Sequence, residues 1–583
     1  MRQRLRRYIN IANRIFNPRQ LFIPSQANTA GALYDIRNLS SLFQNQQQLA
    51  VTTWGDPVGL VLDQQATGAL RAVLDGVSGT YLSTPDSAAV SIVGDIDLRF
   101  DVALPDYTPS ANIILLAKGS SVVPASLEYA LELEPTGILH FYWSTGAATL
   151  SAQSTASVPF ANLARGCIRV TLDADNGAGG NTVTFYSGTE FGTWTQLGSA
   201  VTAAGTTSIQ NSTNTVALGS FTGGTSGLVT GQIFRAQIYN GIAGTMVADF
   251  DATRYTGGAT CPSSTGETWT LNGNARIVQQ GNHAVQVTAG SRPVYARHPL
   301  TGLNNLFTTA TDTFTTRTFT TTAVEYTLSM KGTGTITLTG TSTDGPLVGT
   351  GAGNRVSLTF TPTAGTLTLT VAGSVTEGMI NFGATALTYQ TVTASYDVTQ
   401  AGIADVPYLK DDGNDDFAKA SITPITISTS GVAIFGAVLV LETTTSSDKY
   451  HLGLYSSTDA DTRLAIVQLN GTGRLDLVYQ PDAGGGVTTV QGPAITFGEH
   501  TVIASLSAAG ALSLIVDGTE YTGSVSPAAT IVDRFGIGAK TSTTDGSYAT
   551  MGFPGGGFIN RILTAYETAN VNSYYASVTG ADA

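Results

Sequence analysis

The chain has 583 residues, and only 12% of them are charged, which is half of the ~25% usual for a soluble protein. Hydrophobic cores stop growing at about 250–300 residues, so this length predicts several domains, and a hydrophobic content of 42% excludes wholesale disorder. Gly is abundant at 66 residues, and Thr and Ser dominate the polar positions. This composition disfavours helices and favours strands and tight turns, so the sequence predicts an all-β fold.

Charge is distributed unevenly along the chain. Residues 1–34 contain no acidic residue and carry a charge of +6, so the net charge of −13 leaves −19 on the rest. Binding to a phosphate backbone requires a concentrated basic face. We therefore expect no nucleic acid among the partners of the acidic body.

The basic N-terminal segment has the pattern of a short amphipathic helix. Apolar residues recur every three or four positions over residues 2–17, with arginines between them. A helix this short is unstable alone, so we expect it to dock onto a larger assembly or an anionic surface; a frayed terminus is the alternative. The residues assigned to this anchor arm are Arg2, Arg4, Leu5, Arg6, Arg7, Ile9, Arg14, Ile15 and Phe16.

The cysteines and the lengths of the apolar runs indicate the cellular compartment in which the chain is made. Cys167 and Cys261 provide neither a disulfide framework nor a CxxC zinc motif. No apolar run reaches the ~18 residues of a membrane span, and Arg14 interrupts the apolar core that a signal peptide needs. We expect synthesis in a cytoplasm, with no export by that route and no membrane span.

Residues 54–278 read as short strands separated by Gly, Asn and Asp turns. The clearest predicted hairpin has strands at 168–172 and 182–186, because both arms alternate apolar and polar residues. Further strands are expected at 216–219 and 232–239, the second ending in the turn Asn240-Gly241.

The next block, residues 281–396, contains few charges. Its segments 318–330, 334–340, 355–361 and 366–371 alternate Thr with apolar residues, which predicts a compact antiparallel sandwich. The glycine-rich run 349–353 lacks the Lys-Ser/Thr of a phosphate loop and predicts a hairpin turn.

Residues 397–583 repeat the pattern of the first large block. Both contain a late strand that ends in Leu-Gly or Ile-Gly, at 216–219 and 535–538. Asp517-Gly518 predicts a tight hairpin, and Thr564 with Glu567 forms a capping box that predicts a C-terminal helix. The chain is therefore predicted to hold two copies of one sandwich around a different, smaller one.

Several segments carry a family resemblance. Residues 32–44 and 55–63 look like the opening of many tailed-bacteriophage virion proteins. Residues 170–186 and 194–198 are similar to the laminin-G-like, concanavalin-A-like domains of those proteins, and residues 326–371 resemble a small sandwich that recurs in them. Finally, residues 409–417 and 562–567 look like the first strand and terminal helix of a second such jelly roll.

The patterns and the resemblance together divide the chain into four parts. They are a basic amphipathic anchor arm (1–34), a laminin-G-like jelly-roll sandwich (35–280), a small Thr-rich β-sandwich (281–396), and a second laminin-G-like jelly-roll sandwich with a C-terminal helix (397–583).

The resemblance implies a structural subunit of a phage particle: a tail fibre, spike, head fibre or decoration protein, located in the virion after assembly in the host cytoplasm. Its arm would bind other virion proteins. Its lectin-like sandwiches would pack in a homo-oligomer, with a trimer favoured, and would contact host surface glycans. The chain has no long heptad or collagen-like repeat, which favours a compact spike or decoration over an elongated fibre.

Two other functions are weighed against this one. A polysaccharide depolymerase tailspike would need paired carboxylates ~5–10 Å apart in a groove, and no sequence pattern selects such a pair. A bacterial surface adhesin would need an export signal. We expect no enzyme activity, because the sequence has no Gly-x-Ser-x-Gly turn and its histidines lack metal-binding spacing. They are His140, His283, His298, His451 and His500.

Two Asp-rich turns are candidate sites for structural Ca²⁺, and no other cofactor is expected. Ca²⁺ prefers oxygen ligands, whereas Asp and Asn also support turns by local hydrogen bonds, which is the alternative explanation. The candidate ligands are Asp173, Asp175 and Asn176 in one turn and Asp411, Asp412, Asp415 and Asp416 in the other.

Sugar recognition would need exposed aromatic rings that stack on pyranose faces. The candidates are Trp143, Trp194 and Tyr455, although aromatic residues in strands often belong to the core.

Overall fold

A computed structural model describes residues 31–46, 48–63, 67–309, 313–441, 447–482, 484–526 and 528–579. The predicted anchor helix lies outside these residues. The described residues form mostly strands and turns, with a C-terminal helix, which confirms the all-β prediction. None of the helices they form is long and apolar enough to cross a membrane. The chain divides into two compact units, one of residues 43–50 and 66–281, the other of 31–42, 51–65 and 282–583.

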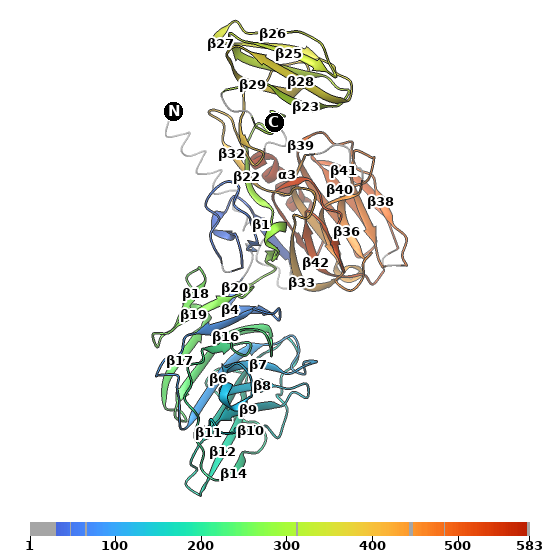
Figure 1. Ribbon diagram of the computed structural model, residues 1–583. Helices are drawn as coiled ribbons and strands as arrows, with labels where there is room; N and C mark the ends of the chain where they lie inside the picture. The colour runs from blue at the N-terminus through green and yellow to red at the C-terminus, as the bar shows by residue number, and fades with distance from the viewer. Residues whose placement is uncertain are drawn as a thin grey trace, which may run out of the picture. The chain divides into compact units, whose positions relative to one another are not determined.

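The first unit, called here the first jelly roll, is a sandwich of two antiparallel sheets (Figure 1). Its strands are β4 (Thr67–Asp75), β5 (Tyr81–Thr84), β6 (Ile96–Ala103), β7 (Ile113–Gly119), β8 (Leu127–Leu133), β9 (Leu139–Ser144), β10 (Thr149–Gln153), β11 (Arg165–Asp173), β12 (Gly180–Gly188), β13 (Thr195–Gln196), β14 (Val201–Ala204), β15 (Val216–Leu218), β16 (Thr230–Asn240), β17 (Thr245–Asp251), β18 (Thr260–Pro262), β19 (Thr268–Asn272) and β20 (Arg276–Gln280). Short 3₁₀ turns are η3 (Pro124–Ser126) and η4 (Ala252–Arg254).

Its first sheet, sheet I, has the order β13-β12-β11-β6-β16-β4-β20, with β14 beside β12 and β17 beside β16. Sheet II has the order β10-β9-β8-β7-β15-β5-β19-β18. The predicted hairpin is confirmed as β11 and β12, with Val170 opposite Phe185.

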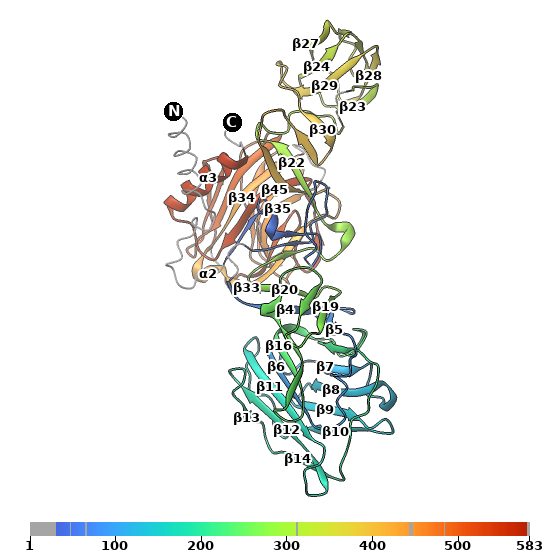
Figure 2. The same cartoon turned by 90° about the vertical axis from the view of Figure 1, so that its left-hand side faces the viewer.

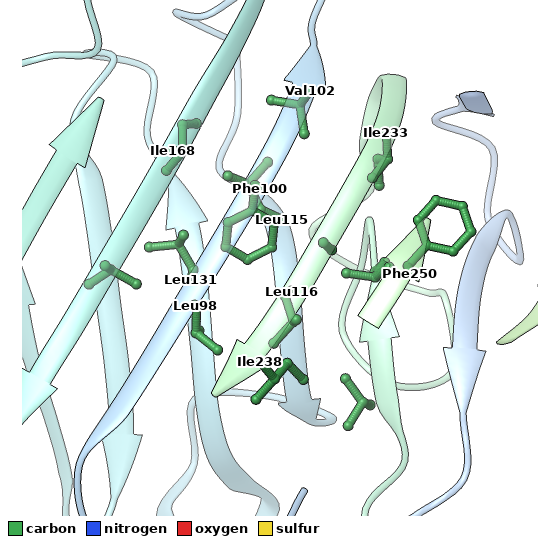
Figure 3. Packing of buried hydrophobic residues seen from close by; sticks show 14 of the residues in the cluster. Leu98, Phe100, Val102, Leu115, Leu116, Leu131, Ile168, Ile233, Ile238 and Phe250 are labelled. Carbon is green, nitrogen blue, oxygen red and sulfur yellow. The ribbon is translucent and has the colours of Figure 1, made fainter. Parts of the chain in front are cut away.

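The core of the first jelly roll lies between the two sheets. Successive side chains of a strand point to opposite faces, so Leu98, Phe100 and Val102 of β6 all point inward. Figure 3 shows them beside Leu116 and Leu131, which come from β7 and β8 of the facing sheet. Burying each such side chain contributes about 1.5–3 kcal/mol, so this layer is the main source of stability of the unit.

The second jelly roll belongs to the other unit. Its strands are β1 (Gly31–Asp35), β2 (Leu42–Phe43), β3 (Leu60–Val61), β21 (Ala284–Val285), β22 (Val294–Pro299), β30 (Thr391–Ala394), β31 (Asp397–Thr399), β32 (Asp405–Lys410), β33 (Ala418–Thr426), β34 (Val432–Val440), β35 (Lys449–Tyr455), β36 (Arg463–Gln468), β37 (Leu475–Gln480), β38 (Thr488–Val490), β39 (Gly498–Leu506), β40 (Ala511–Val516), β41 (Thr519–Ser524), β42 (Ile531–Ile537), β43 (Lys540–Thr541), β44 (Asp545–Gly546) and β45 (Met551–Ile559). Its helical elements are η2 (Leu39–Ser41), η5 (Ala289–Ser291), α2 (Ile427–Ser430) and α3 (Ala565–Thr579).

The strand orders of the two jelly rolls correspond. In one sheet of each, β12-β11-β6-β16-β4 matches β40-β39-β34-β45-β32. In the other, β10-β9-β8-β7-β15-β5 matches β38-β37-β36-β35-β42-β33. The strands also follow one another along the chain in the same sequence, which confirms the prediction that one sandwich occurs twice.

The predicted end of the first jelly roll at residue 280 agrees with the end of the compact unit at Gly281, but the boundary at residue 35 and the assignment of residues 281–299 to the small sandwich are wrong. β1 pairs with β45, placing Tyr34 opposite Gly556, and β22 pairs with β32, so residues 31–42 and 284–299 contribute strands to the second jelly roll. Strand pairing over such distances leaves no local signal in the sequence, so changes of composition do not reveal it.

The small sandwich has strands β23 (Arg317–Thr321), β24 (Tyr326–Gly332), β25 (Thr335–Gly340), β26 (Leu347–Val348), β27 (Gly351–Phe360), β28 (Gly365–Ala372) and β29 (Val375–Phe382). One sheet has the order β23-β28-β25-β26 and the other β27-β24-β29. The alternating run 318–330 therefore forms two strands in different sheets. The run 349–353 is not a hairpin turn, because it leads from β26 in one sheet into β27 in the other.

Helix α3 covers the outer face of the second jelly roll (Figure 2). Its capping box is confirmed: the Glu567 amide donates to Thr564 Oγ1 at 3.3 Å, and the Thr564 amide donates to Glu567 Oε2 at 2.9 Å. Val571, Tyr574 and Tyr575 of the helix pack on an apolar patch that includes Phe435 of β34. An outer sheet face that would otherwise expose apolar side chains is thereby buried.

Candidate functional site

The outer face of sheet I in the first jelly roll is charged and aromatic. Because Leu98, Phe100 and Val102 point into the core, the residues between them in β6 point outward. Arg99 lies opposite Arg169 of β11 and opposite Gln237 of β16. Strand β6 runs between β11 and β16 (Figure 2). We call this surface the arginine face, and define it by Asp97, Arg99, Asp101, Arg165, Arg169, Tyr186, Phe234 and Tyr239.

Asp97 is the centre of the arginine face. Its side chain is fully buried and accepts hydrogen bonds from Arg99 Nη2 at 2.7 Å, Arg169 Nη2 at 2.9 Å and the Ala243 amide at 3.1 Å. Burial by itself would raise the pKa of Asp97, but the hydrogen bonds from Arg169 and Arg99 outweigh it and hold the pKa below its usual value. One buried carboxylate thus fixes two guanidinium groups in position.

Aromatic rings lie against these guanidinium groups. The Arg99 guanidinium carbon is 4.0 Å from the centroid of the Tyr239 ring, and that of Arg169 is 4.7 Å from the Tyr186 ring. Arg165 likewise lies 4.1 Å from the Phe234 ring and pairs with Asp101. Ion pairs and stacking therefore both fix the orientation of the planar guanidinium groups and aromatic rings on this surface.

A second aromatic group borders the arginine face at the turn after β12. Phe191 and Trp194 meet edge to face at 5.7 Å, and the Arg235 guanidinium carbon lies 5.0 Å from the Phe191 ring. Trp194 is half-buried, so part of its ring remains accessible. Of the three predicted glycan-stacking residues, it is the one that the structure leaves accessible.

The prediction is wrong for Trp143 and Tyr455. Trp143 is only 3% exposed and belongs to the core between the sheets, where its indole N–H donates to Thr207 Oγ1 at 2.9 Å. Tyr455 has no exposed surface and packs against Ala465 and Val467. Neither ring can stack on a sugar, because Trp143 is buried between the two sheets and Tyr455 is buried in a separate apolar cluster.

The second jelly roll has apolar residues where the first has the arginine face. In the matching strands β34 and β39, the outward-facing cross-strand pair is Phe435 and Ile503, and both lie in the patch that α3 covers. No counterpart of α3 lies on the arginine face within the described part of the chain. The first jelly roll therefore presents an open, polar version of a surface that the second buries.

Two of the three predicted Ca²⁺ ligands of the first turn, Asp175 and Asn176, accept local hydrogen bonds, and Asp173 lies at the end of β11. Asn176 Oδ1 accepts from the amides of Ala178 and Gly180, and Asp175 Oδ1 accepts from the amide of Gly177. These contacts are typical of a turn stabilised by Asp and Asn side chains, which is the alternative to a Ca²⁺ site.

The predicted Ca²⁺ ligands of the second turn do gather. Asp412, Asp415 and Asp416 each offer a carboxylate oxygen within 4.8 Å of the others. Asp411 is 1% exposed, and neither of its carboxylate oxygens has a hydrogen-bond partner. Burial and the charge of Asp412 raise the pKa of Asp416 to about 7, and burial raises that of Asp411 well above its usual value. An oxygen-rich donor set of this kind fits Ca²⁺, and binding there remains a prediction.

Sequence reasoning missed one cluster, on the outer face of sheet II. His140 has Glu134 Oε1 at 2.8 Å from its Nδ1, and Glu132 lies directly opposite it on β8. The available signal was the alternation Glu132-Leu-Glu134 and His140-Phe-Tyr142 on the two arms of one short hairpin, which places all four side chains at one end of one sheet face.

Comparisons with known proteins show resemblance at the level of fold. No family model and no curated protein sequence matches the chain. Among solved structures, domains LG4-5 of the mouse laminin α1 chain align with 88% of this chain and 95% of their own at 10% identity and a TM-score of 0.24. The CBM40 domain of the Ruminococcus gnavus IT-sialidase aligns with 28% of this chain and 90% of its own at 16% identity and a TM-score of 0.20.

A third match is the ligand-binding domain of botulinum neurotoxin serotype D in complex with N-acetylneuraminic acid, at 8% identity and a TM-score of 0.23; 28% of this chain aligns with 40% of that one. At these identities and TM-scores, the assignment of the fold depends on the strand pairing described above. The class of protein that this pairing defines is an all-β chain of two matching jelly rolls and a smaller sandwich.

Asp416 predicts an unusual pH dependence. A folded-state pKa of about 7, against ~3.9 for an unfolded Asp, means that the folded state binds the proton more tightly. Its contribution is fully present below about pH 4 and is lost as the pH rises to about 7. The melting temperature of the second jelly roll should therefore fall over this range by more in the wild type than in Asp416→Asn, as measured by calorimetry.

The effect of Ca²⁺ on the melting temperature is measured at pH 7.5 with the same two proteins. If the Asp-rich turn binds Ca²⁺, the ion should raise the melting temperature of the wild type and leave Asp416→Asn unchanged. Equal responses of the two proteins to Ca²⁺ would contradict the predicted site, and equal pH profiles would contradict the raised pKa.

Proposed function

We propose that the chain is a non-enzymatic structural protein that binds glycans, and that the arginine face of the first jelly roll is the binding surface. The observation that carries the proposal is the arrangement of fixed guanidinium groups and aromatic rings on a sheet face that no helix covers in the described part of the chain. Guanidinium and carboxylate groups bind pairs of sugar hydroxyls, and aromatic rings stack on the apolar faces of pyranoses. The side chains are already held by Asp97, so binding would immobilise few further rotamers.

The preferred ligand class is an acidic glycan. Arg99, Arg165 and Arg169 outnumber Asp97 and Asp101 on the arginine face, while the chain as a whole is acidic. A guanidinium group forms two parallel hydrogen bonds with a carboxylate, which suits uronic and nonulosonic acids.

The wider role we propose is that of a subunit of a tailed-bacteriophage particle, assembled in the host cytoplasm as a homo-oligomer, with a trimer favoured. The resemblance of the sequence to virion proteins and the +6 charge of residues 1–34 support it. In this role the basic arm binds other virion proteins, and the sandwiches provide subunit contacts and host attachment.

Removal of the rim tryptophan tests glycan binding. Full-length protein is screened on an array of acidic and neutral bacterial glycans, and the best ligand is titrated by calorimetry. Trp194→Ala should weaken binding by up to about tenfold, because a stacked aromatic ring contributes about 0.5–1.5 kcal/mol.

Tyr566→Ala is the matched control, because Tyr566 is an aromatic side chain that is 71% exposed on α3, outside the first jelly roll. Near-ultraviolet circular dichroism checks that both variants fold. If the two variants bind equally well, or if only neutral glycans bind, the arginine face is not the site proposed.

Deletion of the arm tests the virion role. The deletion should stop at residue 30, because residues 31–35 form β1 of the second jelly roll. Particles made with the truncated chain should lack the protein, whereas a chain with Arg2, Arg4, Arg6 and Arg7 replaced by lysine should still be incorporated, since its charge is kept. Normal incorporation of the truncated chain, measured by quantitative mass spectrometry of purified particles, would contradict the anchor.

Depolymerase activity is the alternative that one observation favours. Carboxylate oxygens of Glu132 and Glu134 lie within 4.8 Å of each other, close to the ~5 Å spacing of retaining glycosidases. We expect purified protein to release no reducing ends from capsular polysaccharide. Release that disappears in Glu134→Gln would overturn the non-enzymatic proposal.

A further inference from the structure

The outer face of sheet II carries a row of polar side chains across three strands. Glu132 of β8 lies opposite His140 of β9, which lies opposite Gln153 of β10. Their chain neighbours Leu131, Leu133 and Phe141 point into the core, so this row faces away from it. Tyr142 follows His140 by two residues and lies on the same face.

These side chains converge on the Nδ1 atom of His140. Glu134 Oε1 lies 2.8 Å from it, the Tyr142 hydroxyl 2.7 Å, and Gln153 Nε2 3.3 Å. A neutral imidazole nitrogen offers one proton or one lone pair in its plane, so it can satisfy only one of the three. The Tyr142 hydroxyl also lies 3.3 Å from Glu132 Oε1, which brings the second carboxylate to the same point.

The cluster holds more negative than positive charge. Within the described part of the chain, no Lys or Arg forms an ion pair with Glu132 or Glu134. Glu132 is only 5% exposed, so its carboxylate is largely removed from water. A bound cation would compensate this buried negative charge.

The carboxylates are already oriented by neighbouring amides. Asn112 Nδ2 donates to Glu132 Oε1 at 2.7 Å, and Gln153 Nε2 donates to Glu134 Oε1 at 2.7 Å. The Tyr142 ring stacks on the His140 ring at 4.0 Å between centroids, which fixes the plane of the imidazole. Outer contacts of this kind hold ligands in the orientation that a metal ion requires.

We propose that Glu132, Glu134 and His140 bind a divalent transition-metal ion, with Zn²⁺ preferred. One donor atom from each lies within 4.8 Å of the others, and donor atoms around a tetrahedral Zn²⁺ lie roughly 3.4 Å apart, so small side-chain rotations suffice. An imidazole together with two carboxylates favours Zn²⁺ over Ca²⁺, which takes oxygen ligands only.

The proposed site opens to solvent. A pocket of about 520 Å³ borders it, lined by His140, Gln153 and Val201 among others. Three protein ligands leave a fourth position for water or for an oxygen of a bound molecule. This inference does not depend on glycan binding by the arginine face, because the two sites lie on the outer faces of different sheets.

Metal titration of the full chain tests the proposal. Protein freed of any affinity tag and dialysed against a chelator is titrated with ZnCl₂ and with CaCl₂ by calorimetry, and CoCl₂ is added to record the visible absorption of tetrahedral Co²⁺. We expect Zn²⁺ to bind, a tetrahedral Co²⁺ spectrum, and a higher melting temperature of the first jelly roll with Zn²⁺.

Four variants separate a metal site from a hydrogen-bonded cluster. His140→Ala and Glu134→Gln should each weaken Zn²⁺ binding by at least about tenfold and abolish the Co²⁺ spectrum. Glu190→Gln, an exposed Glu of the same jelly roll, should bind as the wild type does. Tyr142→Phe removes a hydrogen-bonding group that is not a ligand and should retain the Co²⁺ spectrum.

Three results would overturn the proposal: no Zn²⁺ binding by the folded wild type, equal Zn²⁺ binding by the wild type and His140→Ala, or tighter binding of Ca²⁺ than of Zn²⁺ at this cluster. Near-ultraviolet circular dichroism of each variant shows whether a loss of binding reflects a loss of fold.

Discussion

A two-layer sandwich buries only the inner faces of its sheets, and this constraint governs the rest of the structure. Each outer face must either be polar or be covered, because an exposed apolar sheet face would associate with other molecules. The second jelly roll covers one outer face with α3, which packs Tyr574 and Tyr575 on Phe435. The first jelly roll replaces the corresponding residues with arginine and aspartate, so the same fold provides a closed surface in one copy and an open one in the other.

The open face depends on Asp97. A buried carboxylate is costly alone, and removing one partner of a buried ion pair typically costs about 3–5 kcal/mol. Here two arginines and a backbone amide satisfy Asp97, and the rings of Tyr239 and Tyr186 cover the arginines. The ion pairs and ring contacts that stabilise Asp97 also hold the arginine side chains in one orientation. Selective binding of a polar ligand requires such a fixed orientation.

The two outer faces of the first jelly roll differ in chemistry. Sheet I presents guanidinium groups and aromatic rings, whereas the β8–β9 end of sheet II presents Glu132, Glu134 and His140. The first arrangement suits anionic sugars and the second suits a metal cation, for reasons of charge alone. Under the two proposals, one sandwich would bind an anionic sugar and a metal ion on separate faces.

The amino-acid sequence by itself determined the features that depend on nearby residues. The β11–β12 hairpin, the Asp517-Gly518 turn, the capping box of α3 and the duplication of the jelly roll all follow from preferences within a few positions or from repetition of pattern. Tertiary structure alone decided which aromatic rings are buried, and so separated Trp194, in the loop before β13, from Trp143 and Tyr455. It also decided that β1 joins β45 and that Glu132 meets His140. Strand pairing and register depend on the free energy of the whole sheet, which no short segment encodes.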